Sequence, residues 1–168
     1  MLKAKPMVVS TRELMPIIVG MLDNNQRVIF TVSGDSMRPF IINNRDQVVL
    51  ERKNKKNLRV GDIILFQTMD KYLLHRIYRK EKDGYRTIGD ACLQDDGLVF
   101  NSQILGVVNR IYRKGKEIDC KKGFWRVVSL LWVKLLPFRR YLLYLYFLLA
   151  RIKQKLPQNT KEMEDCND

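Results

Sequence analysis

The chain has 168 residues, 46% of them hydrophobic, which is enough for one compact domain with an appendage and excludes a chain too polar to form a core. Its formal net charge of +13 favours an anionic partner, either a phospholipid surface or a nucleic acid. The three cysteines, Cys92, Cys120 and Cys166, are far apart and odd in number, so we expect reduced thiols and no metal or other cofactor.

Residues 1–26 are expected to form a helical lead-in to the rest of the chain. A helix is predicted over 11–24, with one apolar face formed by Leu14, Ile17, Ile18 and Met21. Charged residues and a proline interrupt the apolar residues of this segment. It is therefore predicted to be neither a signal peptide nor a transmembrane anchor.

Residues 27–120 have the pattern of a β domain. Short segments rich in Val, Ile, Tyr and Phe alternate with turn sequences such as NNRD, KDG and RKG. The predicted strands are 27–32, 47–51, 62–67, 72–79, 85–90, 104–113 and 116–119. Because no helix separates these strands, we expect a mainly β fold with an antiparallel, partly closed sheet rather than a parallel βαβ arrangement.

Residues 121–157 form a basic and apolar segment that contains no acidic side chain. Two amphipathic helices are predicted in it, at about 125–136 and 138–154. A membrane span is excluded because basic side chains would lie near mid-bilayer, at about 2.5–3.5 kcal/mol each, and Pro137 would break the helix.

The helical segment has basic side chains interleaved with Leu, Trp, Tyr and Phe, which favours an anionic membrane surface as its partner, contacted through residues 124–156. This interpretation predicts a peripheral protein, at the cytoplasmic face rather than the outer face. The alternative is a helical hairpin that packs on the β domain or on a second copy of the chain, and the oligomeric state is left open. Residues 158–168 are polar and are predicted to be a disordered tail.

The stretch FTVSGDSMRPFI, residues 30–41, places Ser36 just after a predicted strand. This serine is either a nucleophile or a polar residue in a turn, and a nucleophile needs a base. The only histidine, His75, shares a strand face with Leu73 and Ile77, where a histidine is more often structural than catalytic. Its separation of 39 residues from Ser36 allows the two to meet in one cleft, and no lysine has a comparable apolar setting.

Three carboxylates follow in the stretch TIGDACLQDDG. Asp90 comes directly after an apolar strand, whereas Asp95 and Asp96 precede a glycine in a sequence typical of a turn. The preference of Asp and Gly for turns is by itself enough to explain the DDG sequence. A serine–histidine pair nevertheless gains from a carboxylate that fixes the imidazole tautomer and stabilises the imidazolium as it forms.

Four segments, SGDSMRP, VGDIILF, LHR and TIGDACLQDDG, occur in the order and rough spacing of the signal peptidase I and LexA-type serine peptidases. The chain resembles this superfamily over roughly half of its length, and most closely the Ser-His branch of archaeal and endoplasmic-reticulum signal peptidases. The resemblance implies a signal-peptidase/LexA-like fold with Ser36 as nucleophile and His75 as base. It implies Asp96 as the acid of the triad and Asp90 as a second required carboxylate, with Asp95 the weaker choice.

The neighbours of the nucleophile, Gly34, Asp35 and Met37, are candidates for the oxyanion hole or for substrate contacts. The backbone N–H of Ser36 is the expected oxyanion donor, and Gly34 leaves room for close approach of a substrate. Met37 either lines the site or packs in the core.

The function expected from these residues is that of a serine endopeptidase of the signal-peptidase type. It would cleave a leader or signal segment from a secreted or ribosomally made peptide. One alternative is a LexA-like regulatory or nucleic-acid-associated protein, but about 25 residues before the β domain are too few for a helix-turn-helix, so no specific nucleic-acid partner is expected. A second alternative is a catalytically inactive membrane-surface scaffold, against which the joint presence of serine, histidine and acids argues.

Overall fold

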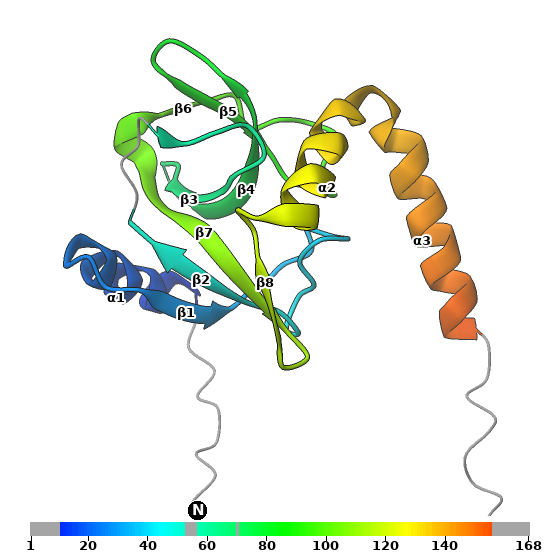
Figure 1. The fold of residues 1–168 in the computed structure, drawn as a ribbon, viewed down its shortest axis with the longest axis horizontal. Coiled ribbons are helices and arrows are strands. Elements are labelled where there is room, and N and C mark those ends of the chain that lie inside the picture. The colour runs from blue at the N-terminus through cyan, green and yellow to red at the C-terminus, as the bar shows by residue number, and fades with distance from the viewer. Residues whose placement is uncertain (1–10, 53–56, 70, 156–168) are drawn as a thin grey trace, which may run out of the picture. The chain divides into compact units, whose positions relative to one another are not determined.

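The fold is given by a computed structural model that describes residues 11–52, 57–69 and 71–155 (Figure 1). Part of the predicted lead-in, the whole of the predicted disordered tail and one cysteine, Cys166, lie outside these residues. The elements are α1 (Thr11–Asp23), β1 (Val28–Thr31), β2 (Gln47–Glu51), β3 (Ile63–Gln67), β4 (Tyr72–Lys80), β5 (Gly84–Ile88), β6 (Leu98–Phe100), η2 (Asn101–Gln103), β7 (Ile104–Arg113), β8 (Lys116–Asp119), α2 (Gly123–Lys134), η3 (Leu136–Phe138) and α3 (Arg139–Lys155).

The strands of the described residues belong to one antiparallel sheet in the order β1-β2-β7-β3-β4-β5-β6, with β8 paired to β7. The long strand β7 pairs with β2, with β3 at its first half and with β8 at its second half (Figure 1). Strands β1 and β6 end the order and do not pair with each other in the described part of the chain. The expected mainly β, antiparallel fold is confirmed, although the sheet is not closed.

The predicted strands are all present, because each one combines alternating or continuous apolar residues with a clear turn on both sides. Strand β6 was not predicted. It has only three residues and pairs with β5, so its sequence is too short to carry an alternation signal. The two C-terminal helices are also present, α2 beginning and ending slightly earlier than expected and α3 ending one residue later.

The core has two apolar clusters, and β3 contributes to both. Ile63 and Leu65 belong to the first cluster, whereas Ile64 and Phe66 belong to the second. Because successive side chains of a strand point to opposite faces, the two clusters lie on the two faces of the sheet at β3. The first cluster also contains the buried residues Met15, Ile18, Leu22, Val28, Val32, Met37, Ile41, Val48, Leu50, Val108 and Ile111.

The helix α1 lies beside β1 and covers the first cluster (Figure 1). Its buried side chains are Met15, Ile18 and Leu22, which are spaced three and four residues apart as one helical face requires. The expectation that Ile17 shares this face is wrong, since its side chain is 60% exposed. A helix places residues 17 and 18 about 100° apart, so burying Ile18 turns Ile17 outward.

The described residues form two compact units that divide between Leu136 and Pro137, so α2 belongs with the β fold and α3 with the second unit. Within the first unit, Trp125 and Trp132 of α2 meet the ring of Phe40 edge-on, with centroids 6.4 and 5.1 Å apart. The guanidinium of Arg113 lies over the Trp125 ring at 5.7 Å. No helix in the described ranges combines the length and the apolar character needed to cross a membrane.

Candidate active site

Ser36, His75 and Asp96 come together from three separate segments of the first unit. Ser36 lies in the connection between β1 and β2, His75 on β4, and Asp96 in the loop between β5 and β6. The Ser36 Oγ lies 3.0 Å from His75 Nε2, and the other ring nitrogen, Nδ1, lies 2.8 Å from Asp96 Oδ2. The residues expected to be nucleophile, base and orienting acid therefore form one hydrogen-bonded chain.

The packing of β4 fixes the imidazole ring of His75. The residue is only 5% exposed, and the Phe66 ring meets the imidazole edge-on at a centroid distance of 6.2 Å. Leu73 and Ile77 belong to the second core cluster, as alternation along the strand predicted, whereas Leu74 packs on the first. Although His75 lies on an apolar strand face, its Nε2 forms a hydrogen bond with Ser36, and the residue is therefore not a purely structural core histidine.

The Asp96 carboxylate is held by two groups besides the imidazole. The hydroxyl of Thr87, a fully buried residue of β5, donates to Asp96 Oδ2 at 2.7 Å, and the Asp96 N–H donates to the Thr87 carbonyl at 3.0 Å. A carboxylate can only accept, so Nδ1 of His75 carries the hydrogen and Nε2 presents its lone pair to the Ser36 hydroxyl. Thr87 was not foreseen, because a strand threonine is ordinary and only the loop geometry brings it to Asp96.

A tight turn after β5 holds the backbone of the nucleophile. The Ala91 N–H donates to the Ser36 carbonyl at 2.7 Å. A Cβ added at Gly89 would lie 2.8 Å from the Ser36 carbonyl oxygen and 3.0 Å from His75 Nε2. Only glycine leaves space for both groups, so this turn sets the position of Ser36 relative to the ring.

Replacing Gly89 with alanine is expected to lower kcat/KM by about 100-fold, because a shift of the order of 1 Å between reacting groups has that effect. The control is Gly20→Ala on α1, where an added Cβ meets nothing within 4 Å. Peptidase assays and thermal unfolding of both variants make the measurement. Equal activity of the two variants would contradict a positioning role for Gly89.

Asp90, expected as a second carboxylate of the catalytic machinery, pairs with Arg76, the residue that follows the histidine on β4. The Nε and Nη2 atoms of Arg76 donate to Asp90 Oδ1 and Oδ2 at 2.8 and 2.7 Å, and both residues are buried. Nη1 of Arg76 donates to the Gly61 carbonyl and to Ser129 Oγ of α2, each at 2.9 Å. Asp96, not Asp90, is the carboxylate that contacts the histidine.

Burial on its own lowers the pKa of the Arg76 guanidinium, but the adjacent Asp90 carboxylate raises it, and the net pKa lies above the ordinary arginine value. Arg76 therefore stays charged and needs the carboxylate of Asp90 as its buried partner. The neighbouring Asp95 binds Tyr78 and Arg86 at the surface and does not reach the imidazole.

Of the predicted residues around the nucleophile, Gly34 and Asp35 are exposed and Met37 is not. Gly34 has a φ of +102°, which favours glycine, and its N–H donates to Asn43 Oδ1 at 3.2 Å. Asp35 forms a surface ion pair with Arg38 at 2.8 Å. The expectation that Met37 contacts a substrate is corrected: the side chain is 1% exposed and packs in the first core cluster.

Asp46 supports the segment that follows Ser36, and sequence reasoning missed it. It is fully buried and accepts the Ile42 N–H at 3.0 Å, the Arg45 guanidinium at 2.7 and 2.9 Å, and Arg113 of β7 at 3.0 Å. Arg113 also donates to the Phe40 carbonyl. The carboxylate thus ties the loop after the nucleophile to the centre of the sheet.

Acid is expected to destabilise the fold through Asp46. Burial alone raises the pKa of this carboxyl, but hydrogen bonds from Arg45, the Ile42 N–H and Arg113 outweigh it, and the net pKa lies below the ordinary value. The ionised carboxylate therefore stabilises the fold fully above the unfolded-state pKa of about 3.9, and this stabilisation is lost as the pH falls through the lower folded-state pKa.

Urea unfolding at pH 3–6 tests the contribution of Asp46. Asp46→Asn is expected to lower the free energy of unfolding at the upper end of this range and to weaken its dependence on pH. Asp35→Asn is the control, because that carboxylate is exposed. An Asp46→Asn variant with the pH dependence of the unchanged protein would contradict the assignment.

A comparison with protein families finds that the family model described as Peptidase S24-like matches residues 6–89. The matched stretch contains Ser36 and His75 and ends before the loop that carries Asp96. A comparison with curated proteins finds no match. Within the described ranges, no cluster of three His, Cys, Asp or Glu side chains is arranged to hold a metal ion.

Proposed function

Since the chain belongs to the peptidase S24-like family, we propose that it is a serine endopeptidase that cleaves a leader or signal segment from a secreted or ribosomally made peptide. The observation that carries the proposal is the hydrogen-bonded chain from Ser36 Oγ through His75 to Asp96, with distances of 3.0 and 2.8 Å. The choice of a leader or signal segment as substrate rests on the resemblance of four sequence segments to signal peptidases.

In the proposed reaction, Ser36 Oγ forms a bond to the carbon of the scissile carbonyl while its proton passes to His75 Nε2. The protonated imidazole then gives this proton to the leaving amine as the C–N bond breaks, which leaves an ester on Ser36. Water attacks the ester with His75 again as base, and the serine is restored. Asp96, held by Thr87, keeps the ring in place and stabilises its positive charge in both steps.

The developing oxyanion needs hydrogen-bond donors, and the backbone N–H of Ser36 is the donor that we assign. In the described part of the chain this N–H has no acceptor, whereas the Gly34 N–H is already bonded to Asn43. One such donor contributes about 2.7–4 kcal/mol to transition-state stabilisation in measured cases. Gly34 borders open space two residues before Ser36, since an added Cβ there would meet nothing within 4 Å.

The test is cleavage of precursor peptides by the purified full chain. A library of proteome-derived peptides is incubated with the protein, and new termini are identified by mass spectrometry. Cleavage within leader segments, absent with Ser36→Ala, is the expected result. Failure of the folded protein to cleave any peptide in the library, or equal cleavage by Ser36→Ala, would contradict the proposal.

The net charge of +13 favours one alternative, a self-cleaving regulator that contacts nucleic acid. It predicts that the protein cut by Ser36 is this chain itself, and that duplex DNA binds with an affinity that falls steeply as salt increases. Incubating the protein alone, with and without DNA, distinguishes the two functions. Cleavage of other peptides without self-cleavage supports the endopeptidase.

A further inference from the structure

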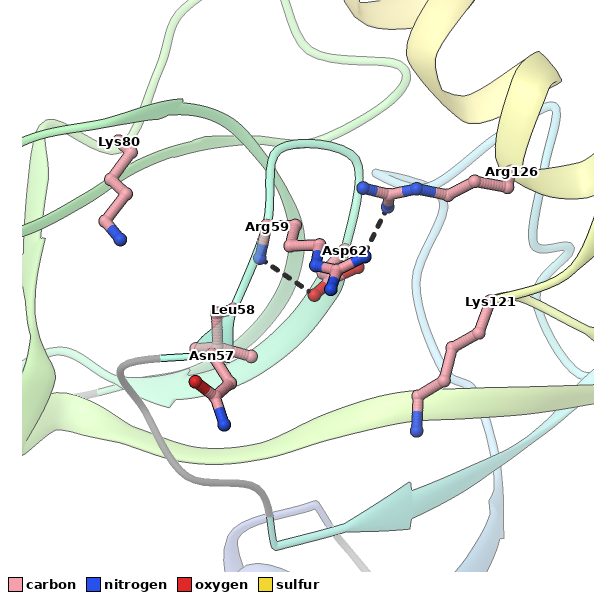
Figure 2. A pocket seen from close by; sticks show the side chains of 7 residues that line it. All are labelled: Asn57, Leu58, Arg59, Asp62, Lys80, Lys121 and Arg126. Carbon is pink, nitrogen blue, oxygen red and sulfur yellow. Dashed lines mark hydrogen bonds and ion pairs between the residues drawn. The ribbon is translucent and has the colours of Figure 1, made fainter.

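One concentration of positive charge in the first unit is an open cavity of about 650 Å³ that does not include the catalytic residues (Figure 2). Its lining residues are Asn57, Leu58, Arg59, Asp62, Lys80, Lys121 and Arg126. Figure 2 shows Arg126 directed at Asp62, with which it forms an ion pair at 3.0 Å. Leu58 is only 3% exposed, so the cavity offers charge without an exposed apolar side chain. Such a cavity attracts small anions, lipid headgroups and nucleic acids alike, and does not identify a partner.

The helix α3, considered by itself in the second unit, combines positive charge with exposed apolar surface. It contains five basic residues and no acidic one. Its exposed apolar and aromatic side chains follow the pattern i, i+3, i+4, i+7, i+8, i+11, and are Tyr141, Tyr144, Leu145, Leu148, Leu149 and Ile152. Side chains with this spacing lie along one side of a helix, so they form a continuous apolar stripe.

Two arginines border this stripe on the same helix. At 100° per residue the six side chains fall within about 140° of the helix circumference, with Tyr144 and Leu149 at the two edges. Arg140 and Arg151 are both exposed, and they lie four residues before and seven residues after Tyr144. These spacings place both guanidinium groups at the Tyr144 edge of the stripe.

A partner that fits α3 has an apolar layer with anionic groups at its boundary. An anionic bilayer offers hydrocarbon to the stripe and phosphates to the arginines, whose long side chains extend from the edge of the stripe toward the headgroups. Tyrosine rings are typical of this boundary. Duplex DNA would leave the stripe in water, and a second copy of α3 would add like charges that no acidic residue in 121–157 compensates.

We propose that α3 is an interfacial helix that binds the surface of an anionic bilayer. The helix lies in the plane of the interface, with the apolar stripe at the boundary of the acyl chains and with Arg140 and Arg151 beside the lipid phosphates. This binding requires no catalytic activity, so its test is independent of the proposed function.

The test is co-sedimentation of the full chain with vesicles of phosphatidylcholine alone and of phosphatidylcholine mixed with phosphatidylglycerol. Binding to the mixed vesicles is expected to exceed binding to the neutral ones. Arg140→Glu is expected to lower affinity for the mixed vesicles about 30-fold, because each basic group at an anionic surface contributes roughly a factor of five and a charge reversal counts twice. A glutamate in the first turn of a helix favours the helix, so a loss of helix does not account for this effect.

The matched control is Lys80→Glu, an equal charge reversal at an exposed residue of the basic cavity (Figure 2). Lys80 ends β4 in the first unit and is not part of α3. The control variant retains the stripe and both of its arginines, and is therefore expected to lower affinity for the mixed vesicles less than about threefold.

The apolar stripe is tested separately with Leu145→Gln, which retains a residue that favours a helix. It is expected to lower affinity for the mixed vesicles at least about tenfold, because moving a leucine side chain from water into apolar surroundings contributes about that factor or more. The control is Leu93→Gln, a leucine of similar exposure on a loop outside α3. Circular dichroism and thermal unfolding establish that each variant is folded.

Three results would overturn the proposal. The first is a lack of binding to the mixed vesicles, or equal binding to neutral and mixed vesicles. The second is an equal loss for Arg140→Glu and Lys80→Glu, which would indicate only general attraction. The third is unchanged vesicle binding by Leu145→Gln together with a dimer in sedimentation velocity that this variant abolishes, which would assign the stripe to a second copy of the chain.

Discussion

Ser36→Ala and His75→Ala are each expected to lower kcat/KM by about 10⁶-fold, because nucleophile and base act as a unit and losing either one removes the covalent route. The Ser36 hydroxyl has its partner at 3.0 Å in the imidazole, and no other histidine exists in the chain to replace it. The loss is measured as the rate of leader-peptide cleavage. Wild-type protein, diluted until its rate covers the range of the variants, is the reference. Ser33→Ala is the matched control, since Ser33 is an exposed serine in the same connection.

Asp96→Asn is expected to have a smaller effect on the same assay, a loss of about 10⁴-fold, as for the corresponding change in a measured triad. The amide keeps the shape of the side chain but removes the charge that stabilises the imidazolium. Asp95→Asn is the control one residue away, because Asp95 contacts Tyr78 and Arg86 instead of the ring. Similar losses for the two variants, or full activity of Ser36→Ala, would contradict the assigned roles.

The sheet could be predicted from the sequence because most of its strands are marked by their own composition and by the turns beside them. Strand β7 is a ten-residue run of mostly apolar residues that ends at a Lys-Gly turn, so its bounds follow directly from composition. The pairing of Ser36 with His75 could be inferred because the chain has only one histidine and because four short segments resemble one superfamily. These signals are local in the sequence or unique in it.

The features that sequence reasoning missed depend on contacts between distant segments. Thr87 reaches Asp96 only because the loop after β5 folds back on the strand, and Asp46 reaches Arg113 across 67 residues. From the sequence, Met37 could equally line the site or pack in the core. The structure places its side chain in the core, because the turn after Ser36 directs it inward. Asp90 looks like a catalytic acid from its position in the sequence, and its partner Arg76 is identified only by the register of β4 and β5.

The same buried pair gives the largest expected effect on stability. Asp90→Ala is expected to lower the free energy of unfolding by about 3–5 kcal/mol, because it leaves the Arg76 charge buried without its partner. Arg76 is 1% exposed and Asp90 is fully buried, so neither side chain can reach water without local unfolding. Urea unfolding followed by circular dichroism measures the change at neutral pH.

Two further variants separate the charge of this pair from its shape. Arg76→Met combined with Asp90→Leu removes both charges while keeping most of the volume, and is expected to destabilise less than Asp90→Ala alone. Ser129→Ala removes one hydrogen bond to the charged guanidinium from α2 and is expected to lower the free energy of unfolding by about 1.5–3 kcal/mol. A double variant less stable than Asp90→Ala would show that the pair stabilises the fold by more than the cost of one unpaired charge. A Ser129→Ala variant of unchanged stability would show that this hydrogen bond does not contribute to holding α2 on the β fold.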